Sequence, residues 1–326
     1  MNQIDYEVES EKDFRHLFNL SRDFIQKIGI DSHQTANAIL ALSEIVTNAI
    51  RYSGKANVYL ASTANKKGVE IVINDDGPGI PNIDEAMKDG FSTFSHASLG
   101  LGLGAAKRCV DELLIDSSSE GTTITLRTYL SGNFSKTDVG VVSYPKHGEV
   151  VNGDRYLIKD YEGDKLLIAI IDGSGHGEKA HIASSMVLKI VEQNYKVPIE
   201  NILIKAHEAL CGREKLTCAE MAIARITDST IEYGSLGNVS GAILSDPKLS
   251  FKINNGRIGM TLPDTLQINR YHRPDEFTLV LHSDGISHTL NLEELCSDST
   301  AQNIAESLFN QFASPSDDAT IIVLRG

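Results

Sequence analysis

The chain has 326 residues, of which 41% are hydrophobic and 23% charged, and its formal net charge at pH 7 is −14. This length suffices for two globular domains, and the mixed composition excludes a disordered or fibrous protein. The negative charge disfavours binding to nucleic acid and to anionic membrane surfaces, because both would repel the protein.

The first part of the chain predicts a domain of α+β type. Apolar residues between Phe14 and Ile28 recur at helical spacing, and a second periodic segment runs from about His33 to Arg51. Two amphipathic helices are therefore expected to open the chain, with His33 on the surface. A further helix is expected from about Gly104 to Leu113. Short runs rich in branched residues predict strands at 57–61, 69–74 and 122–129.

The segment 131–138 contains glycine, asparagine and serine residues and lacks periodicity, which indicates a linker. It divides a first domain, 1–130, from a second domain, 139–326. The second domain predicts many short strands, interrupted by helices near 178–193 and 300–312. Its clearest strands are expected at 166–171, 219–226, 277–282 and 320–324.

Nothing in the sequence predicts export or a membrane span. The beginning, MNQIDYEVESEKDF, has no basic end followed by an apolar core. No later segment approaches the roughly 18 apolar residues that are needed to cross a bilayer. The cysteines are scattered without a CxxC pair, which indicates neither a disulfide framework nor a thiolate zinc site. We therefore expect a cytoplasmic protein with reduced thiols.

One predicted helix of the first domain places two polar side chains together. Glu44 and Asn48 are four residues apart, so they share one face of a helix whose other positions are largely apolar. The amide oxygen of Asn48 can bind Mg²⁺ beside phosphate oxygens, and Glu44 can accept a proton from an attacking hydroxyl or water. The same spacing also occurs on an ordinary solvated helix face.

Two glycine-containing segments follow this helix. Asp75, at the end of a predicted strand, can accept a hydrogen bond from an adenine amino group, and Gly77 and Gly79 let a base approach the backbone. An ordinary Asp-Gly turn is the alternative. Three alternating glycines then precede a predicted helix, whose free amides and positive end can bind phosphate: Gly100, Gly102 and Gly104.

The order of these segments resembles the GHKL ATP-binding fold, the Bergerat α/β sandwich that gyrase, Hsp90, histidine kinases and anti-sigma-factor serine kinases share. The resemblance covers residues 1–130. The absence of a long lid and the segment Asp89–Thr93 before the glycines resemble the serine-kinase branch, particularly its RsbT-type switch kinases. The resemblance implies that the first domain binds ATP and Mg²⁺.

The same resemblance implies a role for each matching residue. Glu44 would orient or deprotonate the serine that attacks the γ-phosphate, and Asn48 would hold Mg²⁺. Asp75 would bind the adenine, and Thr122 would support the adenine end of the site. The glycines would form the base-proximal turn, at Gly77 and Gly79, and the phosphate loop, at Gly100, Gly102 and Gly104.

Four aspartates of the second domain each end a predicted strand or lie in a tight turn: Asp154, Asp172, Asp284 and Asp317. An Asp-Gly turn on its own is usually only a turn. Carboxylates that converge from several strand ends form a hard, oxygen-rich site suited to Mn²⁺ or Mg²⁺. Two such ions can turn water into hydroxide and shield a phosphate, so hydrolysis of a phosphate ester is the expected chemistry.

These segments resemble the PP2C-like phosphatase superfamily, specifically its bacterial SpoIIE and RsbX branch, from residue 139 to 326. The turn Tyr233–Asn238 and the terminal sequence Asp-Asp-Ala-Thr at 317–320 support the resemblance. It implies an αββα sandwich that binds two Mn²⁺ or Mg²⁺ ions. A GHKL domain followed by a PP2C-like domain is therefore the expected architecture.

By this resemblance, Asp172 bridges both metal ions and the carbonyl of Gly173 reaches one of them. Asp284 and Asp317 complete the coordination, and Asp154 is a ligand or holds a water molecule. In this motif the first aspartate of the pair at 317–318 points inward, so Asp318 is not expected to be a ligand. Where larger eukaryotic members carry a Glu-Asp pair, this chain has Gly153-Asp154, which leaves the ligand count at that corner open.

Two residues near these motifs remain open to interpretation. No arginine stands early in the domain to bind substrate phosphate as in larger members of the superfamily, and Arg155 is adjacent to Asp154 but its direction is undetermined. Without such an arginine, substrate affinity would depend on docking of a whole partner protein. His176 is either a proton donor to the leaving serine or a turn residue at the rim of the site.

Together the two resemblances imply a bifunctional regulator of a bacterial partner-switching or stressosome pathway. It would phosphorylate and dephosphorylate serine or threonine on STAS-domain partners, such as a stressosome scaffold or an anti-sigma antagonist. Neither nucleic acid nor membrane is an expected partner. In the alternative, the first domain is an ATP-dependent sequestering or sensing module that gates the phosphatase and is not a kinase.

Overall fold

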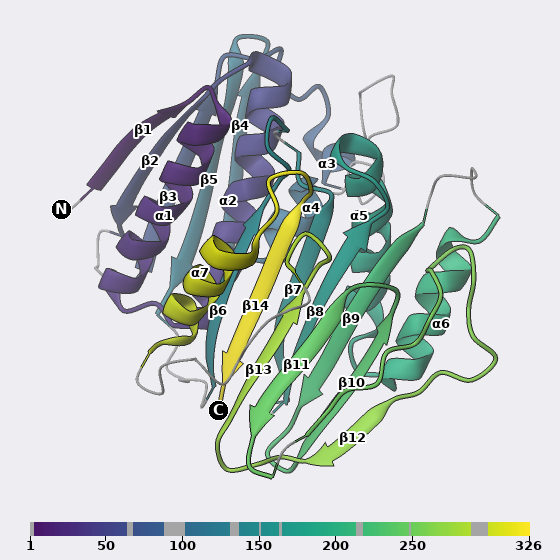
Figure 1. Ribbon diagram of the computed structural model, residues 1–326. Coiled ribbons are helices and arrows are strands. Elements are labelled where there is room, and N and C mark those ends of the chain that lie inside the picture. Colours follow the sequence, from purple (N-terminus) through teal and green to yellow (C-terminus); the bar gives the residue numbers. More distant parts are fainter. Residues whose placement is uncertain are drawn as a thin grey trace. The chain divides into compact units, whose positions relative to one another are not determined.

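The computed structural model describes residues 3–63, 68–87, 102–130, 137–149, 151–162, 165–212, 218–247, 249–287 and 299–326. The chain forms two compact units, Met1–Ser135 and Lys136–Gly326 (Figure 1). The predicted linker at 131–138 stays a prediction, because 131–136 lie outside the described residues. Within the described ranges, no helix is both long and apolar enough to cross a membrane.

The described residues of the first unit form one antiparallel sheet. Its strands lie in the order β1 (Gln3–Val8), β2 (Ala56–Ser62), β3 (Gly68–Asp75), β5 (Gly121–Tyr129) and β4 (Glu112–Ser118). In β5, buried and half-buried residues alternate strictly along the strand. One face of the sheet is therefore packed and the other is more open to water.

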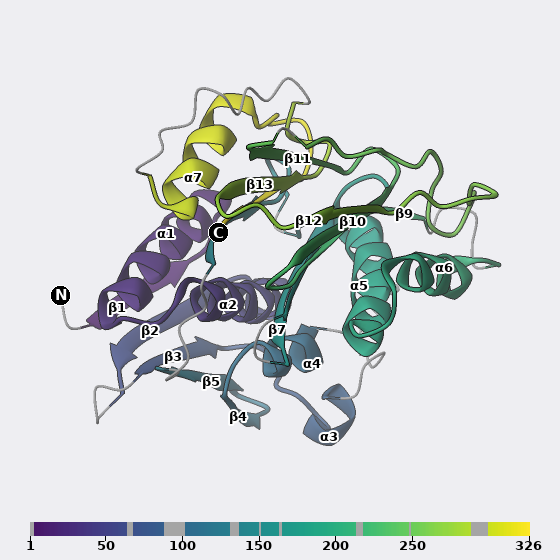
Figure 2. The same cartoon turned by 90° about the horizontal axis from the view of Figure 1, so that it is seen from below.

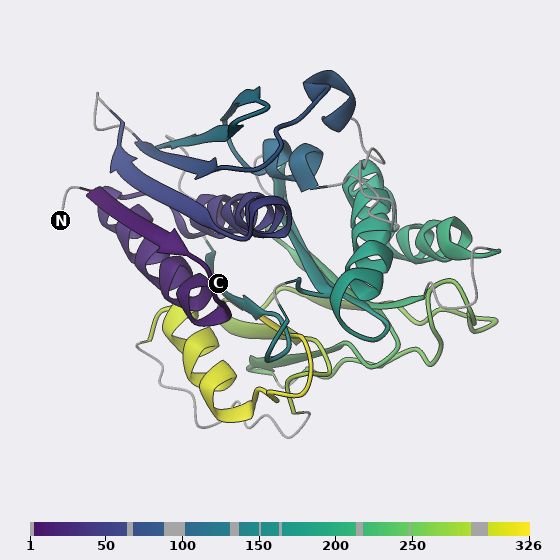
Figure 3. The same cartoon turned by 90° about the horizontal axis from the view of Figure 1, so that it is seen from above.

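Two long helices cover the packed face of this sheet, as Figure 3 shows in purple. They are α1 (Glu11–Ile28) and α2 (Ser32–Ser53), and two shorter helices are α3 (Ile83–Ala86) and α4 (Gly102–Arg108). Both long helices begin at side-chain caps and end at glycines with positive φ, Gly29 and Gly54. The core between helices and sheet includes the fully buried Leu17, Ile25, Leu42, Ile45, Leu60, Ile71, Ile73 and Leu126.

Three predictions for the first unit are corrected by the structure. The helix expected at 104–113 ends at Arg108, and Glu112 already begins β4, which pairs with β5. The run Leu113-Leu114-Ile115 is too short to distinguish a strand from a buried helix by periodicity. A strand, β1, precedes the first helix. His33, expected on the surface, is 2% exposed.

The described part of the second unit contains two antiparallel sheets. The strands of the first are ordered β12 (Asn269–His272), β10 (Thr230–Leu236), β9 (Ala219–Ile226), β8 (Lys165–Gly173) and β7 (Asp154–Tyr161). Those of the second are ordered β11 (Ser240–Ser245), β13 (Phe277–His282), β14 (Ala319–Arg325) and β6 (Asp138–Tyr144). The two sheets lie face to face, with β14 against β7 and β8.

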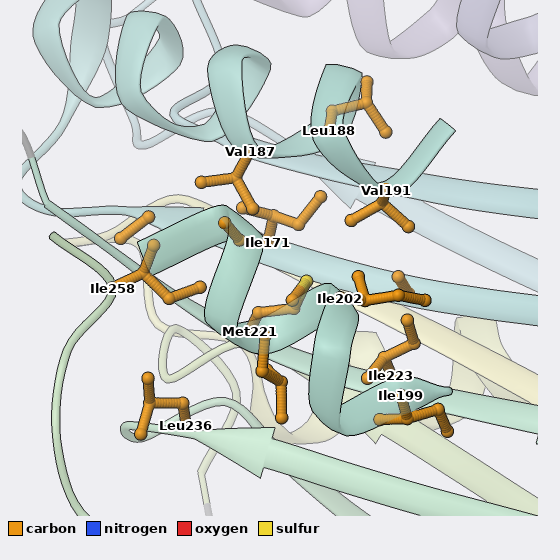
Figure 4. Packing of buried hydrophobic residues seen from close by; sticks show 14 of the residues in the cluster. Ile171, Val187, Leu188, Val191, Ile199, Ile202, Met221, Ile223, Leu236 and Ile258 are labelled. Carbon is orange, nitrogen blue, oxygen red and sulfur yellow. The ribbon is translucent and has the colours of Figure 1, made fainter. Parts of the chain in front are cut away.

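Helices cover the outer faces of both sheets. Helices α5 (Gly177–Asn194) and α6 (Ile199–Leu210) pack on the first sheet, and α7 (Ala301–Phe312) packs on the second (Figure 2). Figure 4 shows buried side chains of α5 and α6 meeting those of the sheet, among them Leu188, Ile202 and Ile223. The predicted α+β class and the αββα layering of this unit are confirmed.

Candidate functional site

Three carboxylates of the second unit lie side by side at one edge of its first sheet. Asp154 begins β7, Asp172 is near the end of β8, and these two residues are direct cross-strand neighbours. Asp172 is in turn the neighbour of Glu220, near the start of β9. Because such neighbours have Cβ atoms about 5 Å apart, the register alone brings the three acids together.

All three carboxylates face the second sheet. Successive side chains of a strand point to opposite faces. The helix-side core contains Leu157 of β7, Ile171 of β8 and Met221 of β9. The three acids occupy positions of the other parity, and therefore lie on the inner face of the sandwich. The three carboxylates therefore gather between the two sheets at this end of the strands.

Asp154 is the most deeply buried of these three carboxylates. It is 2% exposed, and its Oδ2 accepts a hydrogen bond of 2.6 Å from the hydroxyl of Ser283. That hydroxyl accepts a bond of 2.9 Å from the backbone N–H of Thr320. The other oxygen, Oδ1, is buried without a hydrogen-bond partner among the described residues. Burial raises the pKa of Asp154 well above its usual range, although the bond from Ser283 opposes the shift.

Asp172 lies between several acidic neighbours. Removal from water raises the pKa of this carboxyl, and the charges of Asp154 and Asp284 raise it further. Asp284 follows β13 and is itself exposed. A group of mutually repelling carboxylates is unfavourable unless protons or cations neutralise it. The electrostatics of the site therefore favour a bound cation at neutral pH.

The pair at the start of β14 contributes two further carboxylates. Asp318 is 3% exposed, its Oδ1 accepts a 2.9 Å hydrogen bond from the Lys146 N–H, and burial raises its pKa to about 6. Asp317 is half-buried, and burial together with the charge of Asp284 raises its pKa. The second aspartate thus lies deeper than the first, whereas we had expected the first to point inward.

Glycines next to the acids allow close packing that a larger residue would prevent. A side-chain carbon at Gly173 would lie 1.8 Å from the carbonyl oxygen of Ala180. At Gly285 it would lie 2.0 Å from the carbonyl oxygen of Asp318, and at Gly153 2.5 Å from Asp318 Oδ2. These contacts explain why a glycine stands next to Asp154, Asp172 and Asp284.

The donor set fits one or two hard divalent cations. It consists of carboxylates, with the backbone carbonyl of Gly173 beside them, and oxygen ligands of this kind suit Mg²⁺ and Mn²⁺. The buried Oδ1 of Asp154 has room for a ligand bond because no described residue donates to it. Within the described ranges, no three acidic, histidine or cysteine side chains are yet positioned so that together they could hold a metal ion. The ligand set Asp154, Asp172, Gly173, Asp284 and Asp317 therefore stays a prediction.

The structure adds Glu220 to the residues identified from sequence. This residue is 5% exposed, and its two carboxylate oxygens accept hydrogen bonds from the Asn238 N–H (2.5 Å) and from Arg257 Nε (2.7 Å). No glycine turn lies next to Glu220. It is the only acidic residue of the strand AEMAIARI, whose other residues are apolar except for Arg225. A charged residue in a buried strand is rare unless it is paired, and that signal was available.

Two open questions are answered by position. Arg155 shares its strand face with Leu157, so it lies on the helix side of the sheet, away from Asp154. His176 precedes α5 and is half-exposed, with Nδ1 3.0 Å from Glu149 Oε1. Its position in the bend before α5 agrees with its interpretation as a turn residue, and its charge acts on Asp317 and Asp318.

In the first unit, α2 carries the predicted catalytic pair. Glu44 is 5% exposed and Asn48 is half-buried, one turn further along. Gly102, at the start of α4, lies against both: a side-chain carbon there would be 2.9 Å from Asn48 Nδ2 and 3.3 Å from Glu44 Oε2. The glycine lets α4 approach α2 closely. Gly104 is buried in the same helix, and Gly100 lies outside the described residues.

The predicted adenine side of this unit is built by the ends of β3 and β5. Asp75 and Thr122 are direct cross-strand neighbours. Asp75 Oδ1 accepts a 2.9 Å bond from the Gly77 N–H, and burial raises the pKa of this carboxyl. The Thr122 hydroxyl is 2.9 Å from that of Ser117, which also accepts from the Ile80 N–H. The turn is thereby held in a fixed shape.

Helix α2 connects these two groups of residues. A side-chain carbon at Gly77 would lie 3.6 Å from Ser53 Cβ, and Ser53 ends the helix that carries Glu44 and Asn48. At Gly79, where φ is +76°, such a carbon would lie 1.9 Å from the carbonyl oxygen of Ser118. The amide oxygen and carboxylates can bind Mg²⁺ and an adenine amino group, so the residues present fit a magnesium nucleotide.

Two protein families match the chain. Residues 10–128 match the histidine kinase-like ATPase domain, and residues 162–326 match stage II sporulation protein E, abbreviated SpoIIE. The first match contains every residue predicted to bind ATP. The second contains Asp172, Asp284 and Asp317, whereas Asp154 lies just before it.

Three curated relatives are similar to parts of the chain. The serine/threonine-protein kinase RsbT of Bacillus subtilis is 39% identical over 108 residues, 32% of this chain and 80% of that protein. The anti-sigma F factor of Bacillus licheniformis is 37% identical over 114 residues, 33% of this chain and 78% of that protein. Stage II sporulation protein E of Priestia megaterium is 27% identical over 156 residues, 46% of this chain but only 26% of that protein.

Solved structures show the same folds. One, described under the bacterial stressosome as a modular system adapted to control secondary messenger signalling, is 26% identical with a TM-score of 0.55. It covers 59% of this chain and 100% of that chain. The PP2C phosphatase domain of SpoIIE from Bacillus subtilis, with a fragment of its regulatory domain, has a TM-score of 0.50 at 17% identity. It covers 97% of this chain and 92% of that chain, and shows the fold alone.

Proposed function

The chain belongs to the SpoIIE family, whose match spans half of it, residues 162–326, and from this premise we propose that it hydrolyses phosphoserine and phosphothreonine esters of a partner protein. The second unit is a PP2C-type phosphatase domain. The observation that carries the proposal is the strand register that places Asp154, Asp172 and Glu220 side by side on the inner face. Two Mn²⁺ or Mg²⁺ ions are the proposed cofactors.

The residues of this unit would act mainly by position and charge. Asp172, the Gly173 carbonyl, Asp284 and Asp317 would hold the ions, with Asp154 as a further ligand or a holder of water. Bound divalent ions supply hydroxide at neutral pH and shield the phosphate charge. Asp154 is kept in place by Ser283, which is itself held by the Thr320 N–H.

We propose that the first unit transfers the γ-phosphate of ATP to serine or threonine on the same or a related partner. Asp75 and Thr122 would hold the adenine end, Gly77 and Gly79 would let it approach, and Asn48 would hold Mg²⁺. Gly100, Gly102 and Gly104 would bind the phosphates. Glu44 lies within a turn of Asn48 and beside Gly102, which supports its role as the group that orients or deprotonates the attacking hydroxyl. With ATP as donor, the protein would act in the cytoplasm.

The proposed partners are STAS-domain proteins of a partner-switching or stressosome pathway. The similarity to RsbT and the 26% identity to a structure described under the bacterial stressosome support this class of partner. Opposed activities in one chain would let a signal set the net phosphorylation of the partner. The similarity to anti-sigma F factors favours one alternative, in which the first unit sequesters a partner when ATP is bound and does not phosphorylate it.

The phosphatase proposal is tested by Asp172→Asn. We expect Mn²⁺-dependent hydrolysis of an aryl phosphate and of a phosphorylated STAS protein to fall at least 100-fold, because the bridging carboxylate is lost. Asp228→Asn is the matched control, since it removes the same charge from an exposed turn beyond the far end of β9. Full activity of Asp172→Asn in the presence of a chelator would overturn the proposal.

The kinase proposal is tested by Glu44→Gln, which keeps the size of the side chain. With γ-labelled ATP and a STAS partner, we expect phosphate transfer to fall at least 100-fold while ATP binding is retained. Glu85→Gln, on the exposed face of α3, is the control. Unchanged transfer in Glu44→Gln would exclude the assigned role. ATP-dependent partner binding without any transfer by the wild-type protein would instead support sequestration.

A further inference from the structure

A cavity of about 560 Å³ opens beside the carboxylate edge of the second unit. Its wall includes Glu220, which is the cross-strand neighbour of Asp172, so the cavity and the proposed metal site share a side. The turn after β10 and the segment before β12 supply most of the remaining wall. Residues that line it include Asn238, Ser240, Ile253, Asn255, Arg257 and His282.

Arg257 projects from this wall on the same face as the acids. The next residue, Ile258, belongs to the helix-side core, whereas the side chain of Arg257 reaches Glu220, one of the acids of the inner face. Its Nε donates to Glu220 Oε1 at 2.7 Å. Its side chain is 48% exposed, whereas that of Glu220 is 6% exposed. Among the described residues, neither Nη group of Arg257 has a hydrogen-bond acceptor.

The backbone that carries Arg257 is held rigidly. Ile258 is fully buried, as Figure 4 shows, and pairs with Ala219 through two backbone hydrogen bonds of 3.2 and 2.9 Å. Ala219 is the cross-strand neighbour of Gly173, the residue whose carbonyl is predicted to reach a metal ion. Arg257 and Thr261 also exchange backbone hydrogen bonds of 2.8 and 3.0 Å. The guanidinium group therefore extends from a fixed turn next to the site.

We propose that Arg257 binds the phosphate group of the substrate, and that the adjoining cavity takes the residues next to the phosphorylated serine or threonine. This inference rests on the proposed phosphatase function. A guanidinium group binds phosphate oxygens through two parallel N–H bonds. Glu220 fixes the Nε side of the group, and the two Nη atoms remain for the ligand. The positive charge of Arg257 would also reduce the repulsion between the phosphate and the nearby carboxylates.

The competing explanation is that Arg257 only neutralises the buried Glu220. Neutralisation would need the ion pair alone, and the position of the Nη groups would then have no effect on substrate. The two explanations differ in what they predict for the Michaelis constant, for inhibition by free phosphate and for the chemical reactivity of the guanidinium group. Only a phosphate-binding role links all three to the same residue.

Steady-state kinetics with p-nitrophenyl phosphate and Mn²⁺ test the proposal in the full chain. For Arg257→Ala we expect KM to rise at least tenfold, as for loss of a charge-assisted hydrogen bond, with kcat changed less than threefold. The inhibition constant of inorganic phosphate should rise by the same factor. Arg257→Lys should recover only part of the affinity, because lysine keeps the positive charge but lacks the two parallel N–H donors of the guanidinium group.

Arg270→Ala is the matched control. Arg270 also forms an ion pair with a glutamate, in which its Nε is 2.9 Å from Glu232 Oε1, and its side chain is 65% exposed, but it lies on β12 and does not line the cavity. We expect its KM to equal that of the wild-type protein. An unchanged KM and phosphate inhibition constant in folded Arg257→Ala would overturn the proposal.

A second measurement needs no metal and no catalysis. In the wild-type protein with a chelator, phenylglyoxal modifies exposed arginines, and peptide mass spectrometry gives the rate at each. We expect saturating inorganic phosphate to slow modification of Arg257 at least threefold and to leave Arg270 unchanged. Equal rates with and without phosphate would refute the inference even if Arg257→Ala fails to fold. Absence of wild-type hydrolysis would refute the proposed function instead, while the labelling result would still decide the role of Arg257.

Discussion

At the level of single residues, the second unit gathers carboxylates in a place where water is scarce. Asp154 and Asp318 are almost fully buried, and Glu220 lies beside them with a salt bridge to Arg257. Burying like charges together destabilises a folded protein unless something neutralises them. The stability of this unit should therefore depend on both pH and divalent metal.

The pH dependence has a defined sign. Burial raises the pKa of Asp318 to about 6, from 3.8, and raises that of Asp154 and Asp172 as well. A carboxyl group with a higher pKa in the folded chain binds its proton more tightly when folded. Its contribution to stability is complete below pH 4 and is lost as the pH rises through the folded pKa. For Asp318 alone this amounts to about 3 kcal/mol.

We therefore expect the metal-free second unit to be less stable at pH 8 than at pH 5. Urea unfolding in the presence of a chelator, followed by a signal from this unit, measures the difference. Mn²⁺ should restore stability at pH 8, because bound cations neutralise the carboxylates. Asp318→Asn should remove the part of this pH-dependent change in stability that Asp318 contributes. Stability that increases from pH 5 to pH 8 without metal would contradict this account.

At the level of elements, sequence periodicity predicted those strands and helices whose apolar positions are regular. The strands expected at 219–226 and 277–282 coincide with β9 and β13. The edge strands β1 and β12 were among those not predicted: β12 has only four residues, whereas Ile4, Tyr6 and Val8 of β1 alternate with polar residues and could have indicated a strand. Helix α6 was also missed, although Ile202, Ala206 and Leu210 are buried at helical spacing.

Asp154, Asp172 and Asp284 were recognised because each has a glycine next to it, and the structure explains that association by close contacts. Asp317 was recognised from the sequence Asp-Asp-Ala-Thr, which contains no glycine. Glu220 has no such glycine in its own strand; its partners Asn238 and Arg257 come from distant segments. Their approach depends on the sheet register, which a single sequence does not reveal. Arg257 was overlooked for the same reason.

One element offers a direct test of local stabilisation. Helix α1 begins with a capping box, in which the Asp13 N–H donates to Ser10 Oγ at 3.3 Å and the Ser10 N–H donates to Asp13 Oδ2 at 3.0 Å. Ser10→Ala should lower the unfolding free energy of the first unit by about 1 kcal/mol. Gln26→Ala, exposed in the same helix, is the control for urea unfolding. Equal stability of the two variants would show that the cap contributes nothing.

At the level of the whole molecule, each unit has its own core and its own candidate site. The chain divides at 135/136, between β5 of the first unit and β6 of the second. A unit with a complete core is expected to fold by itself. The two proposed activities can then be lost separately by substitution in one unit.

We expect the fragments 1–130 and 139–326 to fold independently. Each should show a single cooperative urea transition, and addition of Mn²⁺ should shift only that of 139–326. Circular dichroism and fluorescence of the two purified fragments measure both effects. A fragment that stays unfolded at neutral pH, with metal present, would mean that the division by compactness does not correspond to independent folding.

The hydroxyl of Ser283 joins the two sheets of the second unit at one atom. It donates to Asp154 of β7, in one sheet, and accepts from Thr320 of β14, in the other. A shift of one sheet against the other by about an ångström would break this bridge and rotate the carboxylate away. The rate of the proposed hydrolysis would therefore depend on how the two sheets are aligned. A ligand that displaces either sheet would change this rate without contacting the carboxylates.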